Sequence, residues 1–254
     1  MRPWLAACLA LAAMAALVGP AAAQEAPAEI GDVLSNVVPE QGNALRAELI
    51  PLLLVVTVLS LAPGILMMVT CLPLMVIVFS FLRQALGLQQ SPPNMMITSL
   101  ALFLTFFVME PVFTSAWENG IAPLRDGEIA EAEAFDAVMV PFRAFMEARV
   151  HESTLVALSD SLPGRWETPT AEGAPLSLLV PSFMLSEIKT AFQIGFAVFL
   201  PFLAIDLVVA SVLMALGMMM VPPATVSLPF KLAFFVMADG WTKLAAALLQ
   251  GYAG

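Results

Sequence analysis

A long stretch without any charged residue constrains this chain more than any other feature. No Asp, Glu, Lys or Arg occurs from Ile50 to Leu82, although one helical membrane span needs only about 20 apolar residues. The stretch must therefore bend or break, and the Pro63-Gly64 pair and Pro73 are where a regular helix is interrupted. A second apolar run from Met95 to Phe113 completes a predicted pair of apolar helices.

The composition of the whole chain indicates a membrane protein. Hydrophobic residues make up 60% of the 254 residues, and only 12% are charged. This balance lies outside that of a soluble globular domain. The formal net charge is -10 and the ten Lys and Arg residues are scattered singly. Because phosphate binding needs clustered positive charge, we expect no nucleic-acid partner.

The first residues have the order of a secretory signal peptide. A positive charge at Arg2 precedes an apolar core from Trp4 to Val18, and small residues follow as far as Ala23. We predict cleavage after Ala23. The mature chain would then keep one cysteine, Cys71, so no intrachain disulfide could form.

The order of polar and apolar stretches predicts an all-α, membrane-associated fold of helical hairpins, with a short helical segment outside the apolar layer. The signal peptide places the mature start outside the membrane, so the acidic segment, with eleven acids and four Arg, is expected there too. The predicted segments are a signal peptide at 1–23, a polar start at 24–49, a first apolar helical pair at 50–113, the acidic segment at 114–182, and a second apolar hairpin with a methionine loop at 183–254.

Five acidic or basic residues lie inside apolar runs, namely Glu110, Asp206, Lys231, Asp239 and Lys243. A charge inside a membrane costs about 2.5 to 3.5 kcal/mol, so each needs a partner or a wet cavity. If the last two apolar runs form a hairpin that turns near Pro223, helix geometry puts Asp206 level with Asp239.

That hairpin leaves Lys231 opposite Ala215 and Leu216, which offer it no counter-charge. Glu187 is the best candidate partner, but it is too far along a straight helix to meet Lys231 in the same chain. Either that helix folds back near Pro201, or the pair forms between copies of the chain. We predict the second, because such a pair would also fix the register of an assembly. The alternative is that Lys231 extends to a lipid headgroup.

Three consecutive methionines, Met218, Met219 and Met220, lie beside the helix-breaking pair Pro222-Pro223. Methionine is unbranched and rearranges at small cost. Non-helical backbone at membrane depth survives only where protein buries it or water lines it. The segment therefore indicates a deformable apolar constriction in a pore, although an ordinary apolar helix end would have a similar composition.

Enzymatic functions have little support in the sequence. His151 is the only histidine, which excludes an HExxH metal site. The chain has no GxSxG nucleophile motif, no GxxxxGK[ST] phosphate loop and no cysteine cluster. We expect no catalytic residues, no metal and no cofactor.

Several long strings resemble the FliP family, the flagellar branch of the type III secretion export-gate proteins. They are ALFLTFFVMEPV, SEIKTAFQIGFAVFLPFLAIDLVVASVLMALGMMMVPPATVSLPFKL and DGW, and the resemblance runs from about Leu45 to Gln250. The signal peptide favours the flagellar branch over the injectisome relatives, which typically lack one.

The resemblance implies a subunit of the protein export gate in the bacterial inner membrane, at the base of the flagellum. Members assemble as a homo-oligomer, a pentamer, with FliQ and FliR next to FlhB and FlhA, and unfolded rod, hook and filament subunits pass through the channel. The acidic segment would lie on the periplasmic side. Family members also form hairpins that sit largely above the ordinary bilayer plane.

The resemblance also assigns roles to individual residues. It places the pore-closing methionines at Met218, Met219 and Met220 and an inter-subunit ion pair at Glu187 and Lys231, and it matches an assembly aromatic most nearly to Phe145. This chain departs from the family at Leu74, where a basic residue is common.

Two other functions fit some of the same features. A small-solute or ion transporter would use Asp206 and Glu110 as coupling carboxylates. A structural scaffold would leave the pore to partner proteins.

Overall fold

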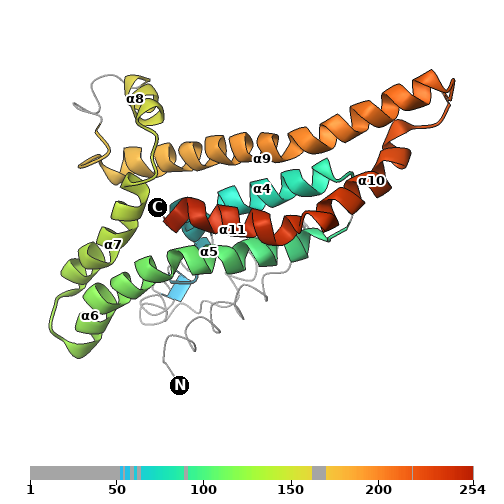
Figure 1. Ribbon diagram of the computed structural model, residues 1–254. Coiled ribbons are helices and arrows are strands. Elements are labelled where there is room, and N and C mark those ends of the chain that lie inside the picture. The colour runs from blue at the N-terminus through green and yellow to red at the C-terminus, as the bar shows by residue number, and fades with distance from the viewer. Residues whose placement is uncertain are drawn as a thin grey trace, which may run out of the picture. The chain divides into compact units, whose positions relative to one another are not determined.

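The computed structural model of the chain is shown in Figure 1. It describes residues 64–88, 91–161, 170–218 and 220–253, and short helical stretches at 52–53, 55–57 and 60–61. All regular structure in these ranges is helical, which confirms the all-α prediction. The signal peptide and polar start predicted for residues 1–49 lie outside the described residues. The chain divides into two compact units after Leu66, and every helix below belongs to the second.

Helix α4 (Leu72–Ala85) follows the predicted interruption, because Pro73 lies in its first turn. Helix α5 (Asn94–Ala116) continues through a π-helical turn (Trp117–Ile121) into α6 (Ala122–Asp126). These three pieces form one helical segment of 33 residues. The rise in acidic residues after Phe113 therefore does not mark the end of a helix.

Helices α7 (Glu131–Glu147) and α8 (Glu152–Asp160) are the short helices of the acidic segment. Both contact α9. Their buried apolar side chains form a separate small core with the start of α9, to which we refer as the second core: Met146, Leu155, Ala174, Leu178, Leu179 and Phe183.

Helix α9 (Leu176–Ala215) has 40 residues and continues through Pro181 and Pro201. At 1.5 Å per residue it is about 60 Å long, roughly twice the thickness of a bilayer's hydrocarbon layer. The shorter α4 lies beside the middle part of α9 (Figure 1). The two helices approach closely at Gly195, where an added Cβ would lie 2.5 Å from the ring of Phe81.

The apolar run after the methionines forms two helices rather than one, α10 (Pro223–Met237) and α11 (Gly240–Ala253). Their axes differ by 59°. The break lies at Asp239, which has a left-handed φ of 51°, a conformation that Asp tolerates better than most residues. Gly240 follows because a Cβ there would lie 2.1 Å from the ring of Phe235.

The main core surrounds α4, which packs against both α5 and α9. Its fully buried side chains include Met75, Val78 and Phe79. Leu74, where the resemblance leads us to expect a basic residue, is buried in the same core. The apolar side chain therefore suits its surroundings, whereas a basic side chain there would need a counter-charge.

Two helical segments of the described chain are long and apolar enough to cross a membrane, Asn94–Asp126 and Leu176–Ala215. A third appears if the bent pair α10 and α11 counts as one span. These segments agree with the predicted membrane-associated fold of apolar helices. The oligomeric channel stays a prediction, since one chain does not test it.

Candidate functional site

The methionine loop, residues 216–222, joins α9 to α10. Helix α9 ends in a Schellman motif, in which Met218 N donates to the Leu213 carbonyl at 2.9 Å and Gly217 N to that of Met214 at 3.0 Å. Gly217 has the positive φ, 71°, that this motif requires. Helix α10 starts at Pro223, whose missing N–H costs nothing at a first helical position. Backbone chemistry therefore places a short loop at this point.

The described methionines of this loop face away from the rest of the chain. Met218 is 46% exposed and Met220 is 98% exposed, while Met219 lies outside the described residues. Among the described residues, no apolar side chain covers Met220, which is the most exposed large hydrophobic residue there. The described part of the chain therefore leaves Met220 open to contact with another molecule.

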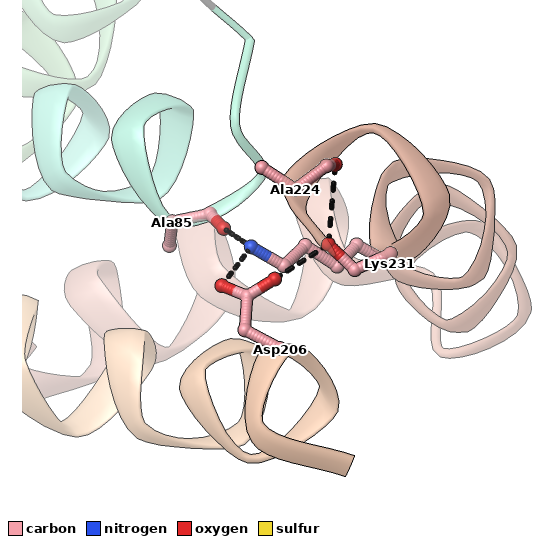
Figure 2. A network of polar contacts seen from close by, with 5 residues as sticks. Ala85, Asp206, Ala224 and Lys231 are labelled. Atoms are coloured by element: carbon pink, nitrogen blue, oxygen red, sulfur yellow. Dashed lines mark hydrogen bonds and ion pairs between the residues drawn. The ribbon is translucent and has the colours of Figure 1, made fainter. Parts of the chain in front are cut away.

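A polar network connects the two arms of the hairpin to α4 (Figure 2). Lys231 Nζ on α10 lies 2.6 Å from Asp206 Oδ2 on α9 and donates to the Ala85 carbonyl at 3.1 Å. Ser227 Oγ donates to the other carboxylate oxygen of Asp206 at 2.6 Å. We refer to these four residues as the hairpin network.

The hairpin network corrects the predicted register. Lys231 does not face Ala215 and Leu216; it pairs with Asp206 of its own chain. The hairpin turns several residues before Pro223, because Gly217 ends α9 and Pro223 begins α10. Asp206 and Lys231 are thus almost equally distant from the centre of the turn, and helix geometry brings them level.

The position of Lys231 follows from the end of α4. The last carbonyls of a helix lack intrahelical partners and carry a partial negative charge. The backbone N–H groups of residues 86 to 88 donate to the carbonyls of Leu82, Gln84 and Arg83. The carbonyl of Ala85 instead accepts a hydrogen bond from the Lys231 ammonium group. The Lys231 side chain is 7% exposed and that of Asp206 is 32% exposed. The cation is therefore more completely removed from solvent than its partner.

A second cluster surrounds Glu187, which is buried on α9. Tyr252 Oη on α11 donates a hydrogen bond to the Glu187 carboxylate. The ring of Tyr252 stacks on Phe145, with centroids 6.2 Å apart, and the guanidinium carbon of Arg149 lies 4.0 Å from the ring centroid. We refer to these four residues as the tyrosine cluster.

The tyrosine cluster brings together two predicted site residues, Glu187 and Phe145, through residues that sequence reasoning missed. Phe145 also packs edge to face against Phe183 of the second core, at 5.8 Å. Tyr252 is the only tyrosine in the chain. The sequence offered one signal for this residue: a tyrosine in an apolar helix needs a hydrogen-bond acceptor for its hydroxyl group.

Glu187 and Lys231 do not meet within the chain, as the sequence predicted. Each has another partner, Tyr252 for the acid and Asp206 for the lysine. Because Lys231 is level with Asp206, it lies about 28 Å along α9 from Glu187 at 1.5 Å per residue. The pair between copies stays a prediction, and it requires neighbouring hairpins to be offset or tilted by that distance.

Among the described residues, the remaining predicted charges, Glu110 and Asp239, form no ion pair. Glu110 is exposed on α5 and Asp239 is exposed at the break between α10 and α11. Asp239 accepts a hydrogen bond from the Thr242 hydroxyl at 3.0 Å. No ion pair or hydrogen bond joins Glu110 to Asp206 in the part of the chain that the structure describes. Within that part, no three His, Cys, Asp or Glu residues are grouped as metal ligands.

Known proteins match this chain over the methionine loop and the hairpin network. Residues 55–248 match the FliP family. The chain is 47% identical over 242 residues to the flagellar biosynthetic protein FliP of Caulobacter vibrioides, covering 95% of this chain and 88% of the relative. It is also 46% identical over 241 residues to the protein of the same name from Rhizobium meliloti, and this match covers 94% of this chain and 96% of the relative.

A third relative gives the same result. The chain is 46% identical over 203 residues to the flagellar biosynthetic protein FliP of Bacillus subtilis, covering 80% of this chain and 91% of the relative. The matched residues include all of α4 through α10, and with them the methionine loop, the hairpin network and the Glu187 end of α9. The chain therefore belongs to the FliP family.

Proposed function

We propose that this chain is a subunit of the flagellar protein export gate and that the methionine loop closes the resting channel. The observation that carries the proposal is the exposure of Met218 and Met220 on a non-helical loop between apolar helices. Such backbone is stable at membrane depth only where protein surrounds it or water lines it. Because the described part of the chain leaves Met220 fully exposed and Met218 half-exposed, we infer that other subunits or a pore surround the loop.

Methionine suits a seal that must open for a polypeptide. Its thioether side chain has three rotatable bonds, so several copies can fill an irregular constriction and then move aside. A narrow apolar constriction excludes ions and water by dewetting. An unfolded protein passing through would replace methionine contacts with contacts to its own side chains, and the seal would re-form behind it.

The assembly is proposed on the same basis. Exposed apolar side chains continue along α5, α9 and α10 in the single chain, among them Phe103, Phe196 and Phe230. Neighbouring copies, and the partners FliQ, FliR, FlhB and FlhA that the resemblance implies, would cover these faces. The inner membrane and flagellar basal body are the corresponding location, with the acidic segment on the periplasmic side.

Replacing Met218, Met219 and Met220 together by alanine tests the closure. We expect the assembled complex to be recovered in normal amount and ion leakage through it to rise several-fold, measured as conductance in planar bilayers. The matched control is alanine at Met95 and Met96, two exposed methionines at the start of α5. Unchanged leakage in the assembled loop variant would contradict the seal.

A transporter that uses Asp206 and Glu110 has no support from the geometry, since Asp206 is bound to Lys231 and Ser227. The scaffold alternative predicts that the loop never touches cargo. Cross-linking from residues 218–220 to an export substrate stalled in the channel distinguishes it, because a scaffold would give no product.

A further inference from the structure

We propose that Lys231 is a positioning residue that sets the resting place of the methionine loop by anchoring α10 to the C-terminal end of α4. The proposal rests on the function given above, in which this loop closes the channel. It concerns the chain's own hairpin network, Asp206, Ser227, Lys231 and the Ala85 carbonyl.

The inward face of α10 is unusually polar for an apolar helix. Its buried residues are Ser227, Lys231 and Phe235, which are spaced four apart and so form one stripe. Two of these three belong to the hairpin network. The large apolar side chains Phe230, Phe234 and Val236 are exposed instead. Polar contacts, rather than apolar packing, therefore determine how the first two turns of α10 lie against α9.

These polar contacts allow little freedom of register. Hydrogen bonds weaken steeply when distance or angle changes, whereas apolar contacts are non-directional. A shift of α10 by one residue would turn Lys231 about 100° away from Asp206 and from the end of α4. The network therefore specifies a single resting position for the first two turns of α10, which lie between the methionine loop and the apolar contact of Phe235 with Phe202.

The anchor on α4 gives that position a fixed reference. Helix α4 is the centre of the main core, and Ala85 at its end is buried. Lys231 contacts this end and the opposite arm at once, about two helical turns after α10 begins. The methionine loop lies directly before α10, and between the loop and Phe235, the next buried side chain of α10, Lys231 holds the helix to the end of α4 (Figure 2).

The test measures loop position and leakage separately in the complex isolated from cells. Spin labels at Gln84, exposed near the end of α4, and at Leu216, exposed at the start of the loop, report the loop distance. A second pair at Gln84 and Leu200 reports the packing of α9 on α4 as a reference. Lys231→Met removes the ammonium group and keeps a long apolar chain.

We expect Lys231→Met to broaden the Gln84–Leu216 distance distribution, to leave the Gln84–Leu200 distribution unchanged and to raise ion leakage several-fold. Lys231→Arg should restore most of both properties. Lys243→Met, on an exposed lysine of α11 outside the network, is the matched control. A narrow, unshifted loop distance together with normal leakage in assembled Lys231→Met would overturn the proposal.

If Lys231→Met does not assemble, Asp206→Asn carries the same test, because the amide keeps the shape of the carboxylate and loses its charge. Wild-type distance and leakage in that variant would overturn the proposal. The two proposals also fail separately. A displaced loop in Lys231→Met, combined with normal leakage in the methionine variant, keeps Lys231 as the positioning residue and rejects the methionine seal.

Discussion

The two ends of α9 each hold a buried or partly buried acid, but by different means. At the Glu187 end, the tyrosine cluster lies against the second core, where Leu178, Leu179 and Phe183 are fully buried. At the Asp206 end, the hairpin network adds directional polar contacts to the packing of Phe202 against Phe235. Apolar contacts tolerate small movements, whereas directional polar contacts are kept or lost together. The comparison teaches that the end beside the methionine loop is built to occupy discrete positions, and the other end to stay packed.

The largest expected effect comes from removing apolar packing at the Glu187 end. Phe183→Ala deletes a fully buried ring of the second core and should lower the free energy of unfolding by about 3 to 5 kcal/mol. Limited proteolysis of α7 and α8 in the detergent-solubilised complex measures it. Phe135→Ala, an exposed phenylalanine on α7, is the control. Equal protease sensitivity in the two variants would mean that the second core does not hold this end.

The next largest loss of stability is expected when the hairpin network is broken. Asp206→Ala leaves the buried Lys231 without its carboxylate and should cost about 3 kcal/mol, because an uncompensated buried charge is expensive. Adding Lys231→Met should recover part of that cost, since the two residues act as a pair. A double-mutant cycle on denaturant unfolding, followed by tryptophan fluorescence, measures the coupling. Purely additive losses would show that the ion pair contributes no coupling energy.

A smaller effect separates the hydrogen bond of the tyrosine cluster from its packing. Tyr252→Phe keeps the stacking on Phe145 but removes the donor to Glu187, and we expect a loss of about 2 kcal/mol for the unsatisfied carboxylate. Thermal unfolding of the complex measures it. Combining it with Glu187→Leu should reduce the loss, because no buried carboxylate then remains. A larger loss in the combined variant would contradict this account.

The smallest effect is expected at Ser227. Ser227→Ala removes one of the hydrogen bonds to Asp206 and leaves the ion pair in place, so the loss should be about 1 kcal/mol. Hydrogen exchange at the backbone amides of α10 is the measurement. Ser211→Ala is the matched control, because that exposed hydroxyl bonds only to a carbonyl of its own helix. Equally fast exchange in both variants would show that Ser227 does not stabilise α10 through its hydrogen bond to Asp206.

Sequence reasoning identified the right residues more often than the right contacts. Asp206 and Lys231 were singled out because charges in apolar runs need partners, and Glu187 was singled out as a candidate partner of Lys231; each has a partner in the structure. The contact between Asp206 and Lys231 was missed because the turn was placed at Pro223. Gly217 and Pro223 together carry the correct boundaries, since glycine ends helices and proline begins them. Tyr252 went unnoticed because no local pattern ties residue 252 to residue 187.

The sequence by itself determined that this chain is helical and apolar, that helices begin beside Pro73 and at Pro223, and which few charges need compensation. These properties depend on local backbone chemistry and on the cost of dehydrating charge, both of which are readable from neighbouring residues. Only the tertiary structure decided which charges meet. That choice depends on where each helix ends and on the 59° break between α10 and α11. It also depends on the Ala85 carbonyl at the end of α4, which accepts a hydrogen bond from Lys231. Contacts between residues far apart in the chain follow from these packing details, because small errors in a turn displace every later residue of a helix.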